Sequence, residues 1–340
     1  MAIIINIEIT NYKLQITNYK LQITKHKTQN TNYKTQIIKQ QIMEIKNVTI
    51  AGAGVLGSQI AWQTAFMGFN VVVYDPFEES IEKSKAFHKG FADLFLNKRN
   101  VSQQQIDETN KRLSYSTNLK EAVANADLVS ESVPEVMDIK KSFYNDLAKF
   151  APEKTIFTSN SSTMLPSSYA QETGRPEKFL ALHFANPVWD ANVGEVMMHD
   201  GTDPKYFDIV LKFAEDIGMV PIPIHKEQSG YVLNTLLVPL LSSAQYLYFN
   251  GVSDFESIDK TWMISTGAKF GPFGIIDMIG LQTVYHIALM NGEKTQNKLM
   301  IDRAAKIKAE FIDEGKMGMS TGEGFYKYPN PKYLDPDFLK

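Results

Sequence analysis

Two residues twelve positions apart have the side chains of a general base and its orienting partner. His183 lies in the stretch Leu180-Ala-Leu-His-Phe-Ala-Asn-Pro187, where an alternating apolar pattern ends at Asn-Pro, and Glu195 opens the next apolar stretch. If these stretches pair as strands, the carboxylate can hydrogen-bond one imidazole nitrogen, fix the tautomer and stabilise the imidazolium formed when the other nitrogen takes a proton. The pair therefore indicates proton abstraction from a hydroxyl group, and the alternative is a purely structural hydrogen bond.

Two further polar positions could hold the oxygen of a reacting hydroxyl or ketone. Ser162 closes the run Ser159-Asn-Ser-Ser162 directly after a predicted strand, at the carboxyl edge where open parallel sheets bind ligands. Asn234 is an amide on an otherwise apolar predicted helix. Each also has a structural interpretation, because the serine run can cap a helix ahead of Pro166 and the amide can be a hydrogen-bonded core residue.

A glycine-rich turn indicates a dinucleotide site. The stretch Asn47-Val-Thr-Ile-Ala-Gly-Ala-Gly-Val-Leu-Gly57 reads as a buried strand and a turn, and a helix-forming stretch follows at 58–67. In such a turn the first glycine makes the turn tight, the second lets the backbone touch the diphosphate, and the third lets the helix pack on the strand. The diphosphate then lies at the helix N-terminus. The residues expected to contact it are Gly52, Ala53, Gly54, Val55, Leu56 and Gly57.

Asp75 predicts which dinucleotide is bound. It follows Gly57 by eighteen positions, at the end of a second apolar stretch, and no Arg occurs in the next ten residues. A carboxylate there accepts hydrogen bonds from the ribose 2′-hydroxyl and repels a 2′-phosphate, so NAD is favoured over NADP. The alternative is an ordinary strand–turn–helix with chance glycines, which the matched context disfavours.

The elements around these residues predict an α/β domain. From Ile45 onward strand and helix patterns alternate, which indicates a Rossmann-type doubly wound parallel sheet with helices on both faces. Helical stretches at 80–98 and 102–112 separate the second and third strands and predict an inserted helical pair. The predicted strands are 45–51, 70–74, 113–116, 127–133, 155–159, 179–185, 194–198 and 219–224.

Beyond Gln228 the strand pattern disappears. Helical stretches at 231–250, 254–265, 281–292 and 296–314, with glycine-containing turns between them, predict an all-α C-terminal domain. We therefore expect an NAD-binding domain over 43–228 and a helical domain over 229–335. The helices carry apolar residues on more than one face, as at 231–241, so we expect a homodimer formed through this domain.

The first 42 residues differ from the rest. Residues 9–15 and 16–22 are identical seven-residue repeats, and degenerate copies continue to Gln36. Thr and Asn fill many repeat positions, and both are indifferent helix formers. Because Met43 opens a segment that leads directly into the first strand, we expect residues 1–42 to be a low-complexity, disordered and dispensable extension.

Composition narrows the remaining possibilities. The chain has 340 residues, enough for two domains, and contains no cysteine, which excludes a thiolate nucleophile and a Cys-ligated zinc. Residues 1–42 hold six Lys and one Glu, and the remainder holds 29 basic and 37 acidic residues without a basic stripe. We therefore expect a small-molecule substrate, no nucleic acid, no metal, no membrane partner and a cytoplasmic location.

In this order, these motifs resemble the L-3-hydroxyacyl-CoA dehydrogenase family, which includes 3-hydroxybutyryl-CoA dehydrogenases. The matching stretches span Met43 to Tyr328: Gly-Ala-Gly-Val-Leu-Gly57 with Asp75, Ser-Asn-Ser-Ser162, His-Phe-Ala-Asn-Pro187 with Glu195, Ser229-Gly-Tyr-Val-Leu-Asn234 and Gly322-Glu-Gly-Phe-Tyr-Lys-Tyr328. The resemblance implies a Rossmann domain joined to a helical dimerisation domain. It also implies NAD-dependent, reversible oxidation of a 3-hydroxyacyl-CoA, plausibly of short chain, to the 3-ketoacyl-CoA in fatty acid metabolism.

The resemblance assigns roles residue by residue. His183 is the general base, Glu195 its orienting partner, and Ser162 and Asn234 hold the reacting oxygen as charge develops on it. Lys98 and Ser162 would contact coenzyme A. The residues implied to contact NAD, besides the glycine turn and Asp75, are Glu135, Lys140, Ser162, Asn186 and Lys327.

Four positions depart from the family pattern and leave alternatives open. Asn-Pro-Val188 continues with Trp189 and Asp190, where the family has Pro after the Val. Thr235 replaces an Arg, and Phe91 stands where the family has a serine that contacts coenzyme A. The added carboxylate and lost polar groups serve an anionic ligand poorly. One alternative is therefore a dehydrogenase of a free 3-hydroxy compound, such as a sugar acid or a carnitine-like amine, and another is a non-catalytic NAD-binding protein.

Overall fold

The computed structural model describes residues 43–340, so the expectations for residues 1–42 lie outside the described residues. The chain divides into two compact units between Ser229 and Gly230. Each unit has its own hydrophobic core. They are called here the NAD-binding unit and the helical unit.

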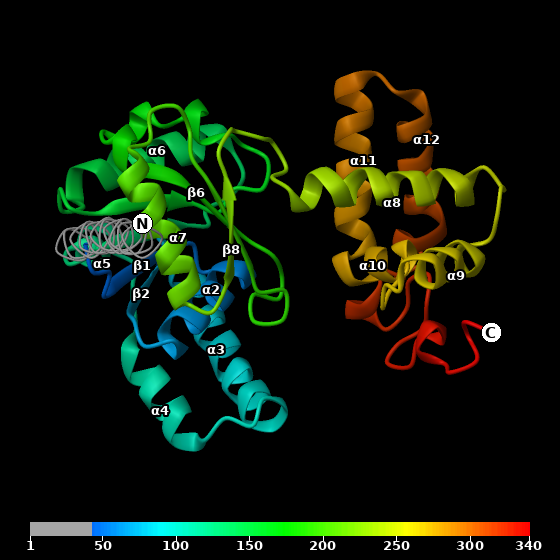
Figure 1. Ribbon diagram of the computed structural model, residues 1–340, viewed down its shortest axis with the longest axis horizontal. Coiled ribbons are helices and arrows are strands. Elements are labelled where there is room, and N and C mark those ends of the chain that lie inside the picture. The colour runs from blue at the N-terminus through cyan, green and yellow to red at the C-terminus, as the bar shows by residue number, and fades with distance from the viewer. Residues whose placement is uncertain (1–42) are drawn as a thin grey trace, which may run out of the picture. The chain divides into compact units, whose positions relative to one another are not determined.

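The NAD-binding unit is built on one eight-stranded sheet with the order β3-β2-β1-β4-β5-β6-β7-β8 (Figure 1). Neighbouring strands are parallel except β6 and β7, which pair antiparallel. The order reverses beside β1, which is where an open α/β sheet forms its ligand crevice. The strands are β1 Asn47–Ala51, β2 Asn70–Tyr74, β3 Leu113–Ser116, β4 Leu128–Glu131, β5 Ile156–Ser159, β6 Phe179–Phe184, β7 Val193–Met197 and β8 Val220–Ile224.

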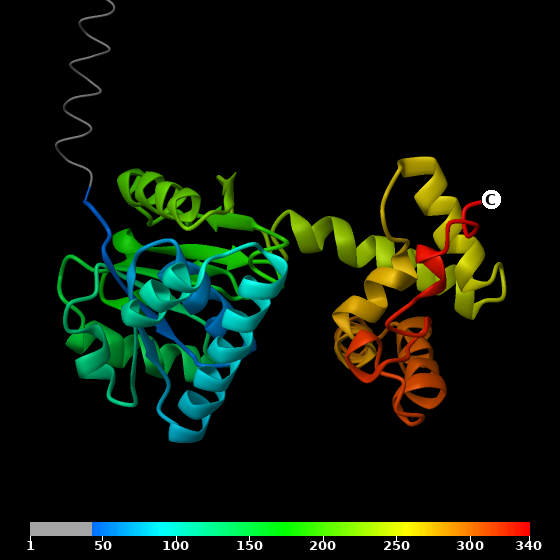
Figure 2. The ribbon, with the colours of Figure 1, turned by 90° about the horizontal axis from the view of Figure 1, so that it is seen from below.

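Helices cover both faces of this sheet (Figures 1 and 2). On one face α2 and α7 contribute Ile60, Ala61, Val210 and Phe213 to a core with alternate residues of the strands. On the other face, α5 and α6 contribute Val123, Tyr144 and Leu147. The helices are α2 Val55–Phe66, α3 Glu78–Lys98, α4 Gln103–Arg112, α5 Leu119–Val123, α6 Met137–Phe150 and α7 Pro204–Asp216, with short 3-10 turns at Pro166–Ser168, Gln171–Thr173 and Pro176–Lys178.

The inserted pair α3 and α4 extends beyond the sheet in Figure 1. Its attachment is aromatic: Trp62 of α2 is fully buried, and the ring of Phe95 meets it edge-on with centroids 5.8 Å apart. Phe66 of α2 also packs edge-on against Phe95, at 5.0 Å. Because α2 carries the glycine turn at its N-terminus, α3 is fixed to the same helix that would bind the dinucleotide.

The doubly wound fold class is confirmed, with two differences in detail. The sheet is mixed rather than parallel, because β6 and β7 are joined by the short segment 185–192, too short for a parallel crossover. Helices α5, α6, α7 and, in the helical unit, α10 were not predicted individually. The segment of α10 was expected to be a turn at 271–274, but Pro272 occupies the first position of a helix, where its missing N–H costs nothing.

The helical unit contains α8 Leu233–Phe249, α9 Phe255–Thr266, α10 Pro272–Ile279, α11 Leu281–Thr295 and α12 Lys298–Ile307, which continues as a π-helical turn at Lys308–Ile312. In Figure 1, α11 and α12 lie side by side and α8 crosses them. The core is rich in aromatic rings, with Phe273, Phe325 and Tyr326 among its buried members. Two short 3-10 turns, Met319–Thr321 and Lys332–Leu334, belong to the C-terminal segment.

Among residues 43–340, no single helix has the length and apolar character to cross a membrane. Within this described part of the chain, α10 and α11 reach that length and composition only when taken together, and they are bent by 98° relative to each other.

Candidate active site

His183 and Glu195 face each other across a strand pair. They are direct partners in the antiparallel register of β6 and β7, and His183 Nδ1 lies 2.9 Å from Glu195 Oε2. Cross-strand partners place their side chains on the same face of a sheet. Both residues are buried, at 5 % and 1 % exposure, which strengthens their interaction by excluding water. The expected pairing of the two stretches is therefore present.

This contact fixes the imidazole tautomer. An ionised carboxylate only accepts hydrogen bonds, so Nδ1 carries the proton and Nε2 keeps its lone pair. Nε2 lies 3.2 Å from the Oγ atom of Ser162, whose hydroxyl donates to it. Ser162 is only half-buried, unlike the histidine. The basic nitrogen thus faces a hydroxyl group on the more open side of the site.

Asn160 holds the loop that carries Ser162. Its Oδ1 accepts a hydrogen bond from the Phe184 backbone N–H at 3.0 Å, and its Nδ2 lies 3.3 Å from Ser132 Oγ. The backbone N–H of Asn160 in turn donates to the carbonyl of Glu131. One side chain thus ties the ends of β4, β5 and β6 together. Asn160 lies in the polar run at 159–162, and no role was predicted for it.

A buried charge network lies behind this loop, and it was not predicted. Glu131, the last residue of β4, has no exposed surface and accepts hydrogen bonds from Lys140 Nζ at 2.7 Å, Ser159 Oγ at 2.7 Å and Tyr144 Oη at 3.2 Å. Ser159 also accepts from Tyr169 Oη at 2.9 Å. Burial next to the Glu131 charge raises the pKa of both Tyr144 and Tyr169, so both phenols remain donors. A charged residue inside the predicted strand 127–133 was the available signal.

Glu135 and Lys140, both predicted to contact NAD, are joined to this network. The Lys140 ammonium is 1 % exposed and also lies 3.3 Å from Glu135. Glu135 accepts hydrogen bonds from Ser161 Oγ and from the backbone N–H and hydroxyl of Thr163. Burial opposes ionisation of Glu135, but the Ser161 hydrogen bond, the Lys140 charge and the Thr163 contacts outweigh it and lower its pKa. Glu135 remains partly exposed, whereas Lys140 lies behind it, and the NAD contact of each stays a prediction.

The three glycines have distinct surroundings. Gly52 has a φ of +109°, and a Cβ there would lie 2.4 Å from the carbonyl oxygen of Ser132. A Cβ on Gly57 would lie 1.9 Å from the carbonyl oxygen of Gly52, so strand and helix touch at this point. A Cβ on Gly54 would meet no protein atom within 4 Å, so the fold itself does not require a glycine there. That pattern fits the close approach of a diphosphate at Gly54.

The start of α2 and Asp75 complete the fit to a dinucleotide. Gly54 is the N-cap of α2 and no side chain caps this helix, whose first N–H groups and positive dipole end suit a diphosphate. Asp75 Oδ2 accepts from the Ala53 backbone N–H at 3.0 Å and Oδ1 from Phe77 at 3.1 Å. The carboxylate is thereby held beside the turn with acceptor capacity left for ribose hydroxyls.

Asn186, also predicted to contact NAD, is held by an unpredicted residue. Gln59 of α2 donates from Nε2 to Asn186 Oδ1 at 2.9 Å and accepts the Val188 backbone N–H at Oε1 at 3.0 Å. This buried amide fixes the segment that follows His183. Lys98, predicted to contact coenzyme A, is exposed at the end of α3.

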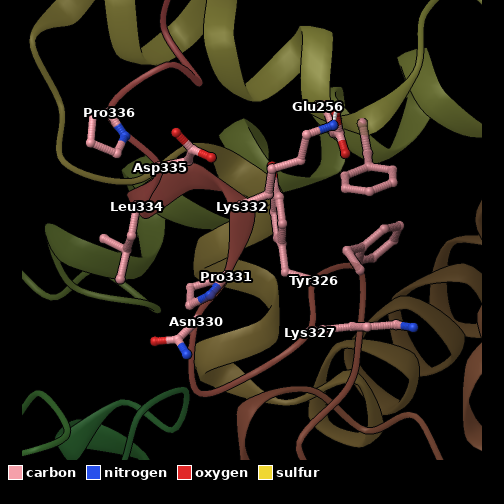
Figure 3. Close-up of a pocket in the computed structure, with 11 residues that line it drawn as sticks. Glu256, Tyr326, Lys327, Asn330, Pro331, Lys332, Leu334, Asp335 and Pro336 are labelled. Carbon is pink, nitrogen blue, oxygen red and sulfur yellow. Dashed lines mark hydrogen bonds and ion pairs between the residues drawn. The ribbon is translucent and has the colours of Figure 1, made fainter.

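Asn234 and Lys327 belong to the helical unit. Asn234 is half-buried in the first turn of α8, and its backbone N–H donates to the Gly230 carbonyl. Lys327 is exposed at the rim of a cavity of about 700 Å³ (Figure 3). Their roles toward substrate and NAD stay predictions. The cavity is lined by Phe255, Glu256, Phe325, Tyr326, Lys327, Asn330, Pro331, Lys332, Leu334, Asp335 and Pro336.

Two buried carboxylates support the segment that lines this cavity. Asp259 accepts from the backbone N–H groups of Phe273 and Gly274 and from Tyr326 Oη. Asp277 accepts from the backbone N–H groups of Phe325 and Tyr326, and from Tyr328 Oη at 3.2 Å. Burial raises the pKa of Asp259 to about 6 and raises that of Asp277 as well. These contacts fold the C-terminal segment onto α9 and α10.

Comparison with known proteins covers both units. The 3-hydroxyacyl-CoA dehydrogenase NAD-binding domain matches residues 47–228, and the C-terminal domain of the same family matches residues 230–328. The mitochondrial hydroxyacyl-coenzyme A dehydrogenase of Sus scrofa is 34 % identical over 290 residues, which covers 84 % of this chain and 91 % of the relative. A probable 3-hydroxybutyryl-CoA dehydrogenase of Bacillus subtilis is 32 % identical over 289 residues, 84 % of this chain and 98 % of the relative.

Solved structures are also similar. A diketoreductase, described as a dual catalyst of dicarbonyl compounds, is 48 % identical with a TM-score of 0.80, and the match covers 84 % of this chain and all of that one. The (S)-3-hydroxybutyryl-CoA dehydrogenase of Ralstonia eutropha is 26 % identical with a TM-score of 0.73 over the same shares. The chain belongs to the 3-hydroxyacyl-CoA dehydrogenase family and is an NAD-dependent oxidoreductase of that family.

Proposed function

We propose that this protein interconverts a 3-hydroxyacyl thioester of short chain and the corresponding 3-ketoacyl thioester, with His183 as the general base. The observation that carries the proposal is the chain of contacts from Glu195 through His183 to Ser162, at 2.9 Å and 3.2 Å. It places Nε2, the ring nitrogen that faces away from the carboxylate, beside a position that a hydroxyl already occupies.

Each residue then has one task. His183 Nε2 takes the proton of the substrate 3-hydroxyl during oxidation and returns it during reduction, and Glu195 stabilises the imidazolium in between. The Ser162 hydroxyl donates to the reacting oxygen as negative charge develops there, and we assign the same task to Asn234. Bound NAD supplies the hydride acceptor, and Asp75 and the turn at Gly54 would hold it.

The test is oxidation of NADH with acetoacetyl-CoA as substrate, followed by absorbance at the nicotinamide band. We expect turnover by the native protein and a loss of roughly 10²–10⁴-fold in His183→Ala, the usual contribution of a general base. His286→Ala, which removes an exposed histidine of the helical unit, is the matched control and should retain full activity. Equal turnover by His183→Ala and the native protein would contradict the proposal.

A second candidate is reduction of a free dicarbonyl compound that carries no coenzyme A. The observation that favours it is the 48 % identity to a diketoreductase, well above the 26 % to the Ralstonia enzyme. The same dyad would perform this reaction, because the reacting group is again a ketone beside a second carbonyl. Comparison of acetoacetyl-CoA with ethyl acetoacetate and free acetoacetate distinguishes the two candidates.

We also propose that the protein is a homodimer formed through the helical unit. Several large apolar side chains of this unit are well exposed, among them Leu236 at 70 %, Leu299 at 65 % and Ile264 at 62 %. Burying such residues against a second copy would remove them from water. A single-chain mass in solution at micromolar concentration would contradict this proposal.

A further inference from the structure

The segment between the two dyad residues is attached to helices on both sides. Residues 185–192 connect β6, which carries His183, to β7, which carries Glu195. Gln59 holds this segment from α2 through Asn186 and Val188. A second attachment reaches it from α3, and this one involves the residues that depart from the family pattern.

Trp189 is the apolar part of the α3 attachment. Its ring meets Phe91 at a centroid distance of 4.8 Å and Phe95 at 5.4 Å, both edge-on. Phe91 also contacts the buried ring of Trp62, at 6.4 Å. Phe91 and Trp189 therefore pack on each other in an aromatic cluster that joins the segment to α3 and α2.

Arg99 and Asp190 are the charged part of this attachment. The Arg99 guanidinium forms an ion pair and hydrogen bond with the Asp190 carboxylate, and it donates to the Trp189 carbonyl oxygen at 3.0 Å. It also lies 5.2 Å from the centroid of Phe95. A guanidinium is the side chain best suited to binding phosphate through paired hydrogen bonds, and here its Nη2 donors are directed at Asp190 and the Trp189 carbonyl.

Two of the four lysines of α3 also form ion pairs. Lys83 pairs with Glu79 at 2.7 Å, and Lys85 pairs with Glu82 at 2.6 Å. Within residues 43–340, Lys89 and Lys98 make no ion pair, and only Lys98 lies next to Arg99. The end of α3 nearest the catalytic segment thus offers a phosphate one uncommitted cation.

The separation of Asp190 from His183 along the chain limits which part of a substrate Arg99 can meet. Asp190 is seven residues from His183, so the two lie at most about 25 Å apart. A coenzyme A thioester that reacts at His183 carries its phosphates far from the reacting carbon, at the other end of the pantetheine arm. An extended thioester of this kind reaches within the same upper limit, where Asp190 pairs with the Arg99 guanidinium.

We propose that Asp190 is a specificity-determining residue: by neutralising Arg99 it removes recognition of the coenzyme A nucleotide, so that the enzyme selects its substrate by the 3-ketoacyl group alone. This inference rests on the proposed ketone reduction at His183. It predicts that acetoacetyl-CoA and acetoacetyl-N-acetylcysteamine, which share the reacting thioester and differ by the nucleotide, are reduced with similar efficiency.

The test compares kcat/KM for these two thioesters in the native protein and in Asp190→Asn. In the native protein the ratio should lie within about threefold of one, and Asp190→Asn should raise it in favour of acetoacetyl-CoA by about three- to tenfold. The effect is modest because the Arg99 and Asp190 side chains are 31 % and 62 % exposed. The gain should shrink at 0.5 M NaCl, since salt screens an exposed cation.

The double variant Arg99→Ala with Asp190→Asn is the control for charge, because it removes the Asp190 carboxylate as Asp190→Asn does but leaves no freed guanidinium; it also removes the Arg99 hydrogen bond to the Trp189 carbonyl. In this double variant the ratio of kcat/KM for the two thioesters should stay at the native value. A native preference for acetoacetyl-CoA above a hundredfold, or an equal change for both thioesters in Asp190→Asn, would overturn the inference while leaving the His183 reaction intact.

Binding gives a readout that does not depend on turnover. Free coenzyme A titrated into the NAD-saturated protein should bind Asp190→Asn about three- to tenfold more tightly than the native protein, measured by calorimetry. Equal affinities would overturn the inference. If the native protein reduces neither thioester but the difference in coenzyme A affinity is present, the proposed function is contradicted instead.

Discussion

The most deeply buried carboxylates of the two units accept hydrogen bonds from different kinds of donor. Glu131 and Glu195 in the NAD-binding unit and Asp259 and Asp277 in the helical unit are all at most 1 % exposed. The first two contact Lys140 and His183, which are titratable side chains. The last two accept mainly from backbone N–H groups and from Tyr hydroxyls.

This difference separates carboxylates that act on a neighbouring basic side chain from carboxylates that hold the backbone in place. A carboxylate that accepts from backbone N–H groups fixes those groups in place, so its replacement disturbs the fold of that segment. A carboxylate that pairs with a basic side chain controls the charge, tautomer or position of its partner. Burial alone therefore does not identify a reactive acid; the hydrogen-bond donors show whether the carboxylate fixes backbone groups or acts on a basic partner.

The sharpest test of the contrast is Glu195→Gln against Asp277→Asn. We expect Glu195→Gln to lower kcat by roughly 10²–10⁴-fold, because the amide no longer stabilises the imidazolium, and to shift the pH profile of kcat. Asp277→Asn should leave kcat of the folded enzyme within about twofold and lower the free energy of unfolding by about 1–3 kcal/mol. Similar activity losses in both variants would remove the distinction.

The next prediction concerns Glu131, whose removal leaves the Lys140 ammonium buried. Glu131→Ala should destabilise the NAD-binding unit by about 3–5 kcal/mol, the usual cost of an uncompensated buried charge. Glu131→Ala combined with Lys140→Met should recover most of that loss. Urea denaturation of the three proteins measures it, and an equal loss in the single and double variants would show that charge burial is not the cause.

Acidification should affect the two units in opposite directions. His88 is buried, its Nε2 donates to the Ser58 carbonyl at 2.9 Å, and burial lowers its pKa to about 4. Between pH 6.5 and 4 the unfolded chain binds this proton more readily, so lowering the pH removes stability on the order of 3 kcal/mol from this site. The pKa of Asp259 is raised by burial to about 6, so from pH 6 to 4 the folded state binds its proton more readily, and the sign is reversed.

Hydrogen exchange followed by mass spectrometry measures the protection of each unit separately in the intact protein. After correction for the intrinsic pH dependence of exchange, protection should fall on acidification around α3 and should not fall around α9 and α10. His88→Gln can keep the hydrogen bond to the Ser58 carbonyl without titrating, so it should flatten the response around α3. A parallel loss of protection in both units would contradict the prediction.

The smallest expected effects are those of alanine substitutions at two glycines. Gly54→Ala should leave stability within about 0.5 kcal/mol, since no protein atom lies near the new methyl group, yet weaken NAD binding about tenfold. A Cβ on Gly324 would lie 2.2 Å from Asp277 Oδ1, so Gly324→Ala should cost about 1–3 kcal/mol and leave NAD affinity unchanged. Thermal unfolding and NAD titration of both variants measure the contrast.

The helix and strand assignments made from sequence depend on the local pattern of apolar residues. They are therefore accurate where that pattern is clear. The strands at 70–74 and 113–116 have the predicted bounds, because alternating or continuous apolar residues specify them directly. The helices α6 and α7 also have amphipathic patterns, but they were not predicted individually. Asn160, Gln59 and Glu131 were given no role, because their partners lie at sequence separations of 9 to 129 residues and leave no periodic signal.

By itself the sequence determined the dinucleotide turn, the NAD preference expected from Asp75 and the pairing of His183 with Glu195. These depend on spacing within a single strand–turn–helix or a single strand pair, where the backbone geometry fixes which side chains meet. Only the tertiary structure decided the Glu131 network, the hold of Gln59 on the catalytic segment and the neutralisation of Arg99 by Asp190. Those contacts join elements that chain connectivity alone does not place together, so packing of the whole unit was needed to bring them within hydrogen-bonding distance.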